Sequence, residues 1–351
     1  DPEEPAGLWV DSGNFECNSN FTVDGDVVVP AGGIYTTNSC QITGDAWARD
    51  YFTDTSGNKT HTRVAGDLTV RAGNMSVTNA SRYGGSISVS GNISGNGFDK
   101  SVIDGTICAS SIDSLPAGKT YGPCTSYINF EQRGFPEITL VAQDWQDEGF
   151  SVKSTSTWTE DVIDGWNLDS YAGWVETNYR NSPCTFGSWI SNAPISLTAT
   201  PSVYDLRGCP SNSGGGFQTN SGVTFKLYSD TAIFADSITL SNTTTFLSGD
   251  GGAHKVWFIV PYGSSGNLQS SNQMRIETPL AAFYYSPNQL SISNNQAIRG
   301  QIYGRNLHVS NHFQMEHVSV GVPGVDLGST DLDVTSSGFL VEVLSKRERQ
   351  Q

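Results

Sequence analysis

Apolar and polar residues alternate in short runs through the first third of the chain, and a glycine precedes each run. In the stretch Val23 to Val29, Gly25-Asp26 precedes three valines, and in Val64 to Val70, Gly66-Asp67 precedes Leu-Thr-Val. Alternation with a period of two residues is typical of a β-strand that buries one of its two sides. The pattern therefore predicts a series of short strands.

These runs recur at a regular interval. Their glycines stand at positions 25, 44, 66, 85 and 105, so the intervals between them are 19, 22, 19 and 20. About twenty extended residues span roughly 66 Å, enough for one coil of three short strands that returns one strand spacing higher. Glycine at each corner allows a positive φ or a close approach between coils. The spacing thus predicts a β-solenoid, whose coils bury their apolar sides only by stacking.

A second periodic stretch lies nearer the C-terminus. The segment 290–294, Leu-Ser-Ile-Ser-Asn, returns at 307–311 as Leu-His-Val-Ser-Asn, and Ile298 returns as Met315, with an offset of 17 in each case. We expect further coils over about 279–325. The apolar run Phe339 to Leu344 is expected to close an edge.

Residues 125–250 lack such a period and contain five of the eight tryptophans. The predicted division is N-terminal solenoid coils over 1–124, a β-rich middle domain with tryptophans and acidic residues over 125–250, and C-terminal coils with a closing strand over 251–351. The predicted fold class is therefore all-β, a right-handed parallel β-helix with an inserted β-rich middle domain.

Composition and charge limit the classes of molecule that this chain is expected to bind. The chain has 19 basic and 35 acidic residues and a formal net charge of −16, which repels phosphate backbones, so we expect no nucleic-acid partner. Charged residues make up 15% of the chain, against about 25% in ordinary domains, which disfavours long exposed helices. With 36% hydrophobic residues, the chain can still fill a core.

Six cysteines indicate an oxidising compartment and up to three disulfides. Cys17 and Cys40 are separated by close to one coil of chain, and equivalent Cα atoms of adjacent coils lie within bridging range. We expect the pairs Cys17–Cys40, Cys108–Cys124 and Cys184–Cys209, out of fifteen possible pairings. Reactive single cysteines are the alternative.

Three segments and the late coils carry a resemblance to a known family. These are Val203 to Cys209, Phe225 to Phe234 and His254 to Pro261, followed by the coil pair that ends near His317. Together they resemble bacterial pilus-associated cell-envelope proteins of the minor-pilin type, in which a hydrophobic N-terminal helix precedes a large extracellular β-solenoid.

The resemblance implies a location on the cell surface at a type IV pilus, partners among other pilus or envelope subunits, and a role in adhesion to a glycan or a host surface. Since the sequence begins at Asp1, we expect the targeting or anchoring segment to be absent from this chain, and membrane contact only through that segment. The family offers no catalytic residues to transfer.

Candidate chemistry concentrates in the middle segment. Trp145, Trp158, Trp166 and Trp174 could stack on sugar rings, and Asp161, Asp164 and Asp169 could bind Ca²⁺ through carboxylate oxygens. The alternative is that the tryptophans belong to the core and the carboxylates to a solvated loop. No other cofactor is expected.

The histidines form a weaker candidate. His308, His312 and His317 could hold zinc or nickel if they converged, and the alternative is a polar outer surface of the last coils.

The sequence contains no G-x-S-x-G, P-loop or H-E-x-x-H motif. We therefore expect a non-enzymatic, extracellular structural and adhesive protein, with a carbohydrate-active or carbohydrate-binding β-helix as the alternative. Ice binding is disfavoured because the outward positions mix Thr69, Ser88 and Asp26 instead of repeating threonine.

Overall fold

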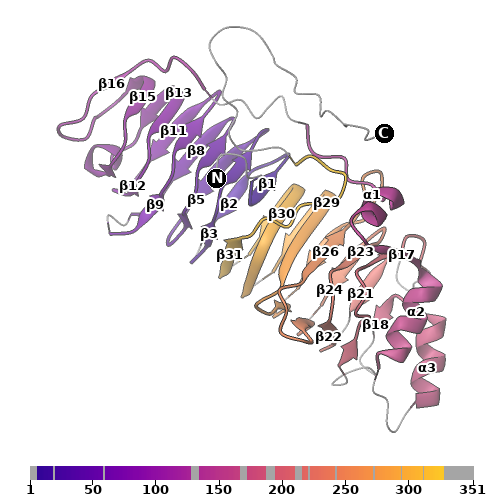
Figure 1. The fold of residues 1–351 in the computed structure, drawn as a ribbon. Helices are drawn as coiled ribbons and strands as arrows, with labels where there is room; N and C mark the ends of the chain where they lie inside the picture. Colours follow the sequence, from indigo (N-terminus) through magenta and orange to yellow (C-terminus); the bar gives the residue numbers. More distant parts are fainter. Residues whose placement is uncertain are drawn as a thin grey trace.

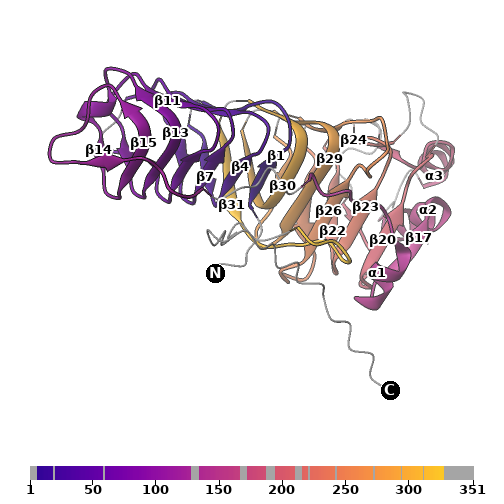
Figure 2. The ribbon, with the colours of Figure 1, turned by 90° about the horizontal axis from the view of Figure 1, so that it is seen from above.

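The molecule is an elongated stack of β-coils (Figure 1). The computed structural model describes residues 6–18, 20–57, 60–127, 134–166, 172–186, 194–209, 216–219, 222–241, 243–271, 273–293, 295–310 and 312–327. The paired strands of the stack run parallel, and seen from above they follow one another along a single rod (Figure 2), which confirms the predicted parallel β-helix.

The strands form three faces. On the first face one hydrogen-bonded ladder runs the whole length of the stack. Its strands, in spatial order, are β17 (Ser151–Ser154), β20 (Ser202–Asp205), β23 (Thr231–Phe234), β26 (Lys255–Ile259), β29 (Ala281–Ile292), β30 (Gln296–Val309), β1 (Leu8–Val10), β4 (Val27–Val29), β7 (Ala46–Ala48), β10 (Leu68–Val70), β13 (Ile87–Ser94), β15 (Ile107–Ile112) and β16 (Tyr121–Gly122).

The second face contains the later parts of β29, β30, β13 and β15, which are long enough to turn a corner of the coil. Its other strands are β18 (Thr185–Phe186), β21 (Phe217–Thr219), β24 (Ile238–Leu240), β27 (Leu268–Ser270), β2 (Phe15–Cys17), β5 (Gly33–Thr36), β8 (Tyr51–Asp54) and β11 (Asn74–Val77).

The third face is divided into two sheets. One contains β19 (Ile195–Ser196), β22 (Thr224–Leu227), β25 (Thr245–Ser248) and β28 (Arg275–Ile276). The other contains the start of β30, then β31 (Phe313–His317), β3 (Thr22–Asp24), β6 (Gln41–Ile42), β9 (Thr62–Val64), β12 (Arg82–Tyr83) and β14 (Val102–Ile103). The division falls between β28 and β30.

The first and last coils of the chain meet in the middle of the stack. Leu8 of β1 pairs with Ile302 of β30 on one side and with Val27 of β4 on the other, and β3 pairs with β31. We call residues 6–124 the N-terminal arm, residues 151–317 the C-terminal arm, and their contact the joint. The arms extend from the joint in opposite directions (Figure 1).

Gln301 of β30 holds both ends of the described chain at the joint. Its Nε2 donates to the carbonyl oxygen of Ala6 over 3.4 Å, and its Oε1 accepts from the backbone N–H groups of Val320 and Gly321 over 2.8 and 2.9 Å. The hydroxyl of Tyr303 also donates to the Ala6 carbonyl, over 3.1 Å. Residues near both ends of the described chain thus meet at mid-length.

Two hydrophobic clusters support the stack. The larger fills the inside of the coils along both arms. The smaller lies outside the first face, where residues 134–150 and 318–327 cover its outward side chains. There Phe135 stacks on Tyr285 with 5.1 Å between ring centroids, and Trp257 donates from Nε1 to the Gly321 carbonyl over 2.6 Å. Burying an outward row of aromatic rings removes more apolar surface from water than the coil interior alone could.

Helices α2 (Thr155–Asp164) and α3 (Ala172–Asn181) occupy the far end of the C-terminal arm, and α1 (Ala142–Asp147) belongs to the segment that covers the outside of the first face. A 3₁₀ turn η1 (Phe98–Lys100) lies in the N-terminal arm. The side chain of Ser154 accepts from the Thr157 backbone N–H at the start of α2, as an N-cap residue does. Helix α2 presents Trp158 to the open end of the hydrophobic interior, so it closes this end of the stack.

The recurring glycines allow close approach at the corners. A Cβ at Gly66 would lie 2.1 Å from Asp45 Oδ1, and one at Gly44 would lie 2.3 Å from Asp26 Oδ1. These carboxylates accept hydrogen bonds from the next coil, Asp26 from the N–H of Asp45 and Asp45 from the N–H of Asp67, over 2.7 and 2.6 Å. The Gly-Asp repeat therefore builds a ladder of side-chain to backbone bonds along one corner.

Three disulfides join Cys17 to Cys40, Cys108 to Cys124 and Cys184 to Cys209. These are the pairs that the sequence spacing predicts. The Cα atoms of Cys17 and Cys40 are 5.6 Å apart, on neighbouring coils. The bonds indicate an oxidising, extracellular environment.

The first ladder continues without a break from the segment 125–250 into the rest of the solenoid. β20 and β23, which lie within it, pair with each other, and β23 pairs with β26, which lies beyond it. The described part of 125–250 thus contributes coils, the covering segment and the three α-helices. The expected closing strand at 339–344 lies outside the described residues.

Candidate functional site

A hollow lies at the joint on the third face, between the two sheets. It has a volume of about 470 Å³. We call it the joint groove and define it by its lining residues, Thr22, Asp24, Ile276, Thr278, Ala297, Ile298, Arg299, Gln314, Met315 and Glu316. Since β28 is not hydrogen-bonded to β30 in the described residues, the groove follows from the interruption of the sheet.

Charged side chains fix the polar wall of the groove. Arg299 Nε lies 3.1 Å from Glu316 Oε1, and Arg299 Nη1 donates to the carbonyl oxygen of Pro279 over 3.1 Å. Asp24 lies on the strand next to Glu316, in register with it, and accepts from the hydroxyl of Thr43. The guanidinium is therefore held in place while it stays about a third exposed, at 30%.

Hydrogen bonding is the chemistry that this wall offers. Gln314 supplies an amide, Thr22 and Thr278 supply hydroxyls, and the charged groups supply strong donors and acceptors. Glycoside hydrolysis uses a pair of carboxyl groups that flank the scissile bond. Here Glu316 is paired with Arg299 and is 57% exposed, so the groove is open to solvent and does not surround this carboxyl group with an apolar pocket.

The sequence contained a signal for this groove. Arg299 and Glu316 are separated by the same offset of 17 that relates Leu290 to Leu307. The structure pairs Leu290 with Leu307 and Arg299 with Glu316 as strand neighbours. Extending the apolar repeat to its polar positions would have placed the ion pair. Asp24 could not be placed in this way, because it belongs to the other arm.

The tryptophans proposed for ligand stacking lie in the core. Trp145 and Trp158 are 1% and 0% exposed, and Trp166 is 6% exposed. Trp145 packs edge-on against Trp257 with 5.2 Å between centroids, and Trp158 donates from Nε1 to the Pro183 carbonyl over 2.9 Å. These three rings therefore offer no face to a ligand, and the core alternative holds for them. The side chain of Trp174 lies outside the described residues.

The aspartates proposed for Ca²⁺ are not gathered into a cation site in the described residues. Asp161 Oδ2 is 2.8 Å from Lys153 Nζ and accepts from the Tyr204 hydroxyl over 2.7 Å. Burial, and then the bond to Asp161, raise the pKa of Tyr204 well above its usual value. Asp164 is exposed at the end of α2, and Asp169 lies outside the described residues. Asp161 thus connects α2 to the first face.

The three histidines lie on different parts of the last coil. His308 projects from the outer side of β30, His312 occupies a turn with a φ of 61°, and His317 packs against Gly25 and Gly7 of the first coil. Among the described residues, no group of three or more His, Cys, Asp or Glu side chains is placed to hold a metal ion. His317 contributes instead to the packing of the joint.

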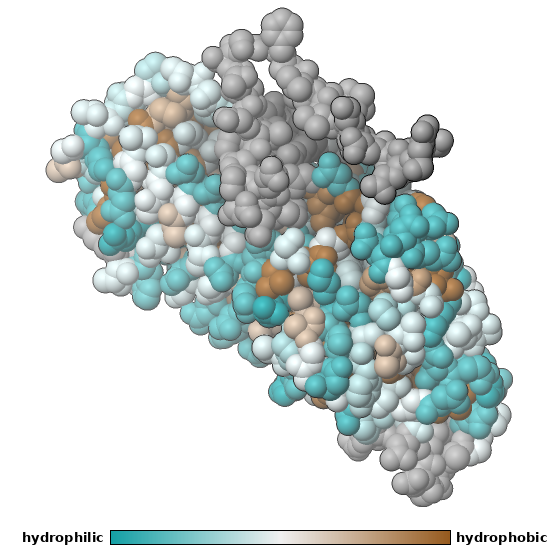
Figure 3. Space-filling model, viewed as in Figure 1, coloured by the Kyte–Doolittle hydropathy of each residue, from teal (hydrophilic) through white to brown (hydrophobic). Residues whose placement is uncertain are grey.

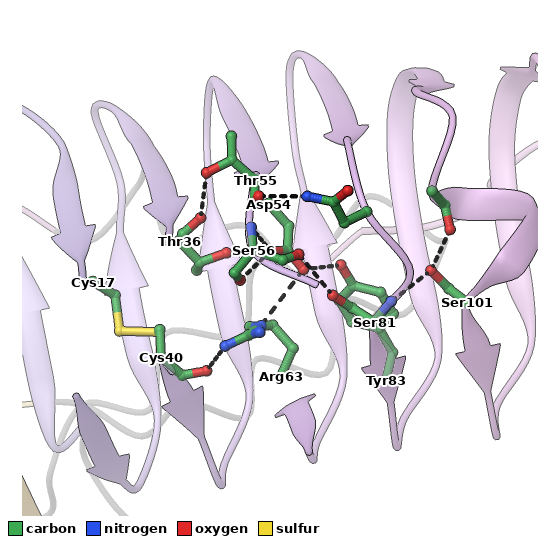
Figure 4. A network of polar contacts seen from close by, with 12 residues as sticks. Cys17, Thr36, Cys40, Asp54, Thr55, Ser56, Arg63, Ser81, Tyr83 and Ser101 are labelled. Atoms are coloured by element: carbon green, nitrogen blue, oxygen red, sulfur yellow. Dashed lines mark hydrogen bonds and ion pairs between the residues drawn. A yellow bond between two sulfur atoms is a disulfide. The ribbon is translucent and has the colours of Figure 1, made fainter. Parts of the chain in front are cut away.

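A buried polar network in the N-terminal arm was not predicted (Figure 4). Arg63 and Asp54 are both 0% exposed, with 3.5 Å between Nε and Oδ2. Asp54 also accepts from the hydroxyls of Tyr83 and Ser56 over 2.9 and 2.8 Å, and Arg63 donates to the carbonyl oxygen of Cys40. Burial, and then the charge of Asp54, raise the pKa of Tyr83 well above its usual value.

The alternation of inward and outward residues along β8 predicts part of this network. In β8, Phe52 points inward, so Asp54, two residues later, must also point inward. An inward carboxylate inside a narrow coil requires a buried partner. The alternation therefore indicates a buried charge pair.

No helix among the described residues is both long and apolar enough to span a membrane. In comparisons with known proteins, no family model matches the chain, and no curated protein and no solved structure matches it.

Proposed function

We propose that this protein is an extracellular structural and adhesive solenoid of the minor-pilin type, held at its joint, whose exposed polar faces make contact with a surface. The observation that carries the proposal is the uninterrupted first ladder, which passes from β17 through the joint to β16. A stack in which every coil is hydrogen-bonded to the next transmits position along its length, as a spacer must.

The exposed surface supports a contact role. On the side drawn in Figure 3, hydrophobic patches are small and are separated by polar residues. The outward positions of the second face are polar, for example Gln269, Ser291 and His308 on successive strands. A broad, flat, hydrogen-bonding surface suits weak attachment over many points better than it suits enclosure of one small molecule.

The attachment partner that we propose is a glycan or host surface, with other pilus or envelope subunits at the joint. The joint groove favours a hydroxyl-rich ligand, because amide, hydroxyl, carboxylate and guanidinium groups line one open wall. Carbohydrate binding is therefore the second candidate function, and it is a specific form of the first.

The proposal is tested with beads that carry the full chain through a linker placed ahead of residue 6. We expect retention on glycan-coated or host-cell surfaces under flow, together with no release of sugar fragments from a matched panel of polysaccharides. Retention on no surface of the panel would contradict the adhesive role. Release of fragments would replace it with a carbohydrate-active function.

A groove variant tests whether the joint groove is the place where a glycan binds. Replacing Arg299 and Gln314 with alanine should lower glycan retention by at least about tenfold if the groove binds the sugar, since each lost charged or amide contact weakens binding. Gln269→Ala, on the second face, is the matched control. Equal loss in the two variants would show that retention does not depend specifically on the groove.

A further inference from the structure

The two tips of the rod are closed in different ways. At the tip of the C-terminal arm, α2 covers the interior and Trp158 fills it, with Tyr204 4.8 Å away between ring centroids. At the tip of the N-terminal arm, a turn over residues 113–120 and the two-residue strand β16 follow the last coil. Strands β17, β18 and β19 at the C-terminal tip also pair on one side only, but α2 contacts β17, Trp158 packs on Phe186 of β18, and Trp166 bridges Ile195 of β19. In the described residues, no helix covers the strands at the N-terminal tip in this way.

The last strands of the N-terminal arm have one unpaired edge. β16 pairs with β15 only at Ile107 and Cys108, so Ala109 to Ile112 have no strand beyond them in the described residues. In the same described set, β14 pairs with β12 alone. An exposed edge is normally protected by charge, proline or a bulge, and Ala109-Ser110-Ser111-Ile112 has no charged residue or proline.

Apolar side chains project at the same tip. Val102 of β14 is 39% exposed and Tyr121 of β16 is 44% exposed, and the other large hydrophobic residues that are exposed in the described chain are Val141 and Tyr262. A hollow of about 340 Å³ lies beside Tyr121 and Lys119. The tip therefore has both unpaired backbone and apolar surface.

We propose that the tip of the N-terminal arm is a contact between two copies of this chain, related by a two-fold axis, so that two rods join end to end. One extended peptide could extend the edge of β15 or that of β14, which lie on different faces, but not both. A second tip of the same cross-section can cover both edges at once, and a two-fold axis sets Ala109 to Ile112 antiparallel to the same segment of the other copy.

Charge and topology agree with a pair of copies. Lys100 lies in η1 just before β14, and Asp113 and Lys119 lie in the turn after β15, so each tip carries both signs of charge. The opposite tip is closed by α2, and therefore association stops at two copies and does not continue into a fibre. The proposal concerns the chain alone in solution and is independent of the proposed adhesive function.

The contact is small. Because only the end of one coil takes part, we expect a contact smaller than the roughly 800 Å² per partner of a standard stable interface, and therefore a weak association that depends on concentration. Sedimentation velocity of the full chain between about 1 µM and 500 µM spans the corresponding dissociation constants. We expect the weight-average mass to rise from one chain towards two over this range.

Paired variants locate the contact. Val102→Asp with Tyr121→Asp should keep the mass at one chain throughout, because each copy places a charge in the contact. Val141→Asp with Tyr262→Asp makes the same chemical changes at the exposed positions elsewhere and should associate like the original chain. Hydrogen exchange at residues 109–112 should slow at high concentration in the original chain only.

Three results would overturn the proposal. They are a single-chain mass at every concentration, equal loss of association in both variants, and association without slower exchange at residues 109–112. If the first variant fails to fold, as judged by its thermal unfolding, Ser111→Arg provides a second test. This serine is exposed on the unpaired edge, and its replacement should raise the dissociation constant at least tenfold.

Discussion

The buried ion pair Arg63–Asp54 constrains how neighbouring coils stack on each other. Each charge loses its hydration, and the pair is tolerated because Asp54 accepts from Tyr83 and from both the hydroxyl and the backbone N–H of Ser56, while Arg63 donates to the Cys40 carbonyl. These partners come from three neighbouring coils. The network thus favours one register of the stack over registers shifted along it.

Removing one partner should therefore be costly. Asp54→Ala leaves the Arg63 guanidinium buried without its counter-charge, and we expect a loss of about 3–5 kcal/mol in the free energy of unfolding, measured by urea titration. Asp104→Ala removes the exposed partner of Arg82 and should cost less than about 1 kcal/mol. Similar losses of unfolding free energy in the two variants would show that the buried ion pair stabilises the fold no more than the exposed one does.

At the scale of the element, strands were far more predictable than helices. The constant offset between the late coils placed Leu307 and Met315 on the neighbours of Leu290 and Ile298, because parallel coils repeat their inward positions at one interval. Helix α2 has no such repeat, and its Trp158 was grouped with possible ligand contacts. Trp158, Val162 and Trp166 are spaced four residues apart and are all buried, so it is the helical period, and not the two-residue period of the coils, that indicates the inward face of this segment.

Inward tyrosines make the coils sensitive to alkali. Burial raises the pKa of Tyr284 and of Tyr83 well above the usual value of 10.0. A tyrosine whose folded-state pKa is raised stabilises the fold fully below its unfolded-state pKa, and this contribution is lost as the pH rises beyond it.

We therefore expect the urea midpoint to hold between pH 7 and about 9.5 and to fall between about pH 10 and 11.5. Tyr284→Phe removes one ionisable group and should make that fall less steep, as followed by urea titration at each pH. A midpoint that is independent of pH up to 11.5 in the original chain would contradict this explanation.

The whole molecule depends on one non-covalent joint between arms built from opposite parts of the sequence. In a solenoid each coil contacts only its neighbours, so the coupling between the arms passes through the contacts of β1 and β3 with β30 and β31, and through Gln301. This order of stacking could not be read from the sequence. Parallel strands repeat the same inward pattern, and nothing in Leu8 to Val10 specifies Ile302 to Gly304 as its neighbour.

Gln301→Ala tests the coupling. It removes the bonds to Ala6, Val320 and Gly321. The Ala6 carbonyl keeps its bond from Tyr303, but the N–H groups of Val320 and Gly321 lose their acceptor, which should cost about 1–3 kcal/mol. Hydrogen exchange should become faster first at residues 8–10 and 318–321. Gln269→Ala, an exposed amide on the second face, should change neither. Faster exchange spread evenly over both arms would mean that the joint is not a separate point of weakness.

The meeting of both described chain ends at Gln301 has a mechanical consequence. Because the described chain begins at Ala6, near the midpoint of the rod, the tips of the two arms lie on opposite sides of that point. When the molecule is held at its joint, as proposed, a load on one tip acts as a torque about the joint, while the coils of the other arm carry little tension. Adding one coil to either arm would move the tip of that arm farther from the joint and increase the torque that a load on it exerts, but the joint itself would stay where it is.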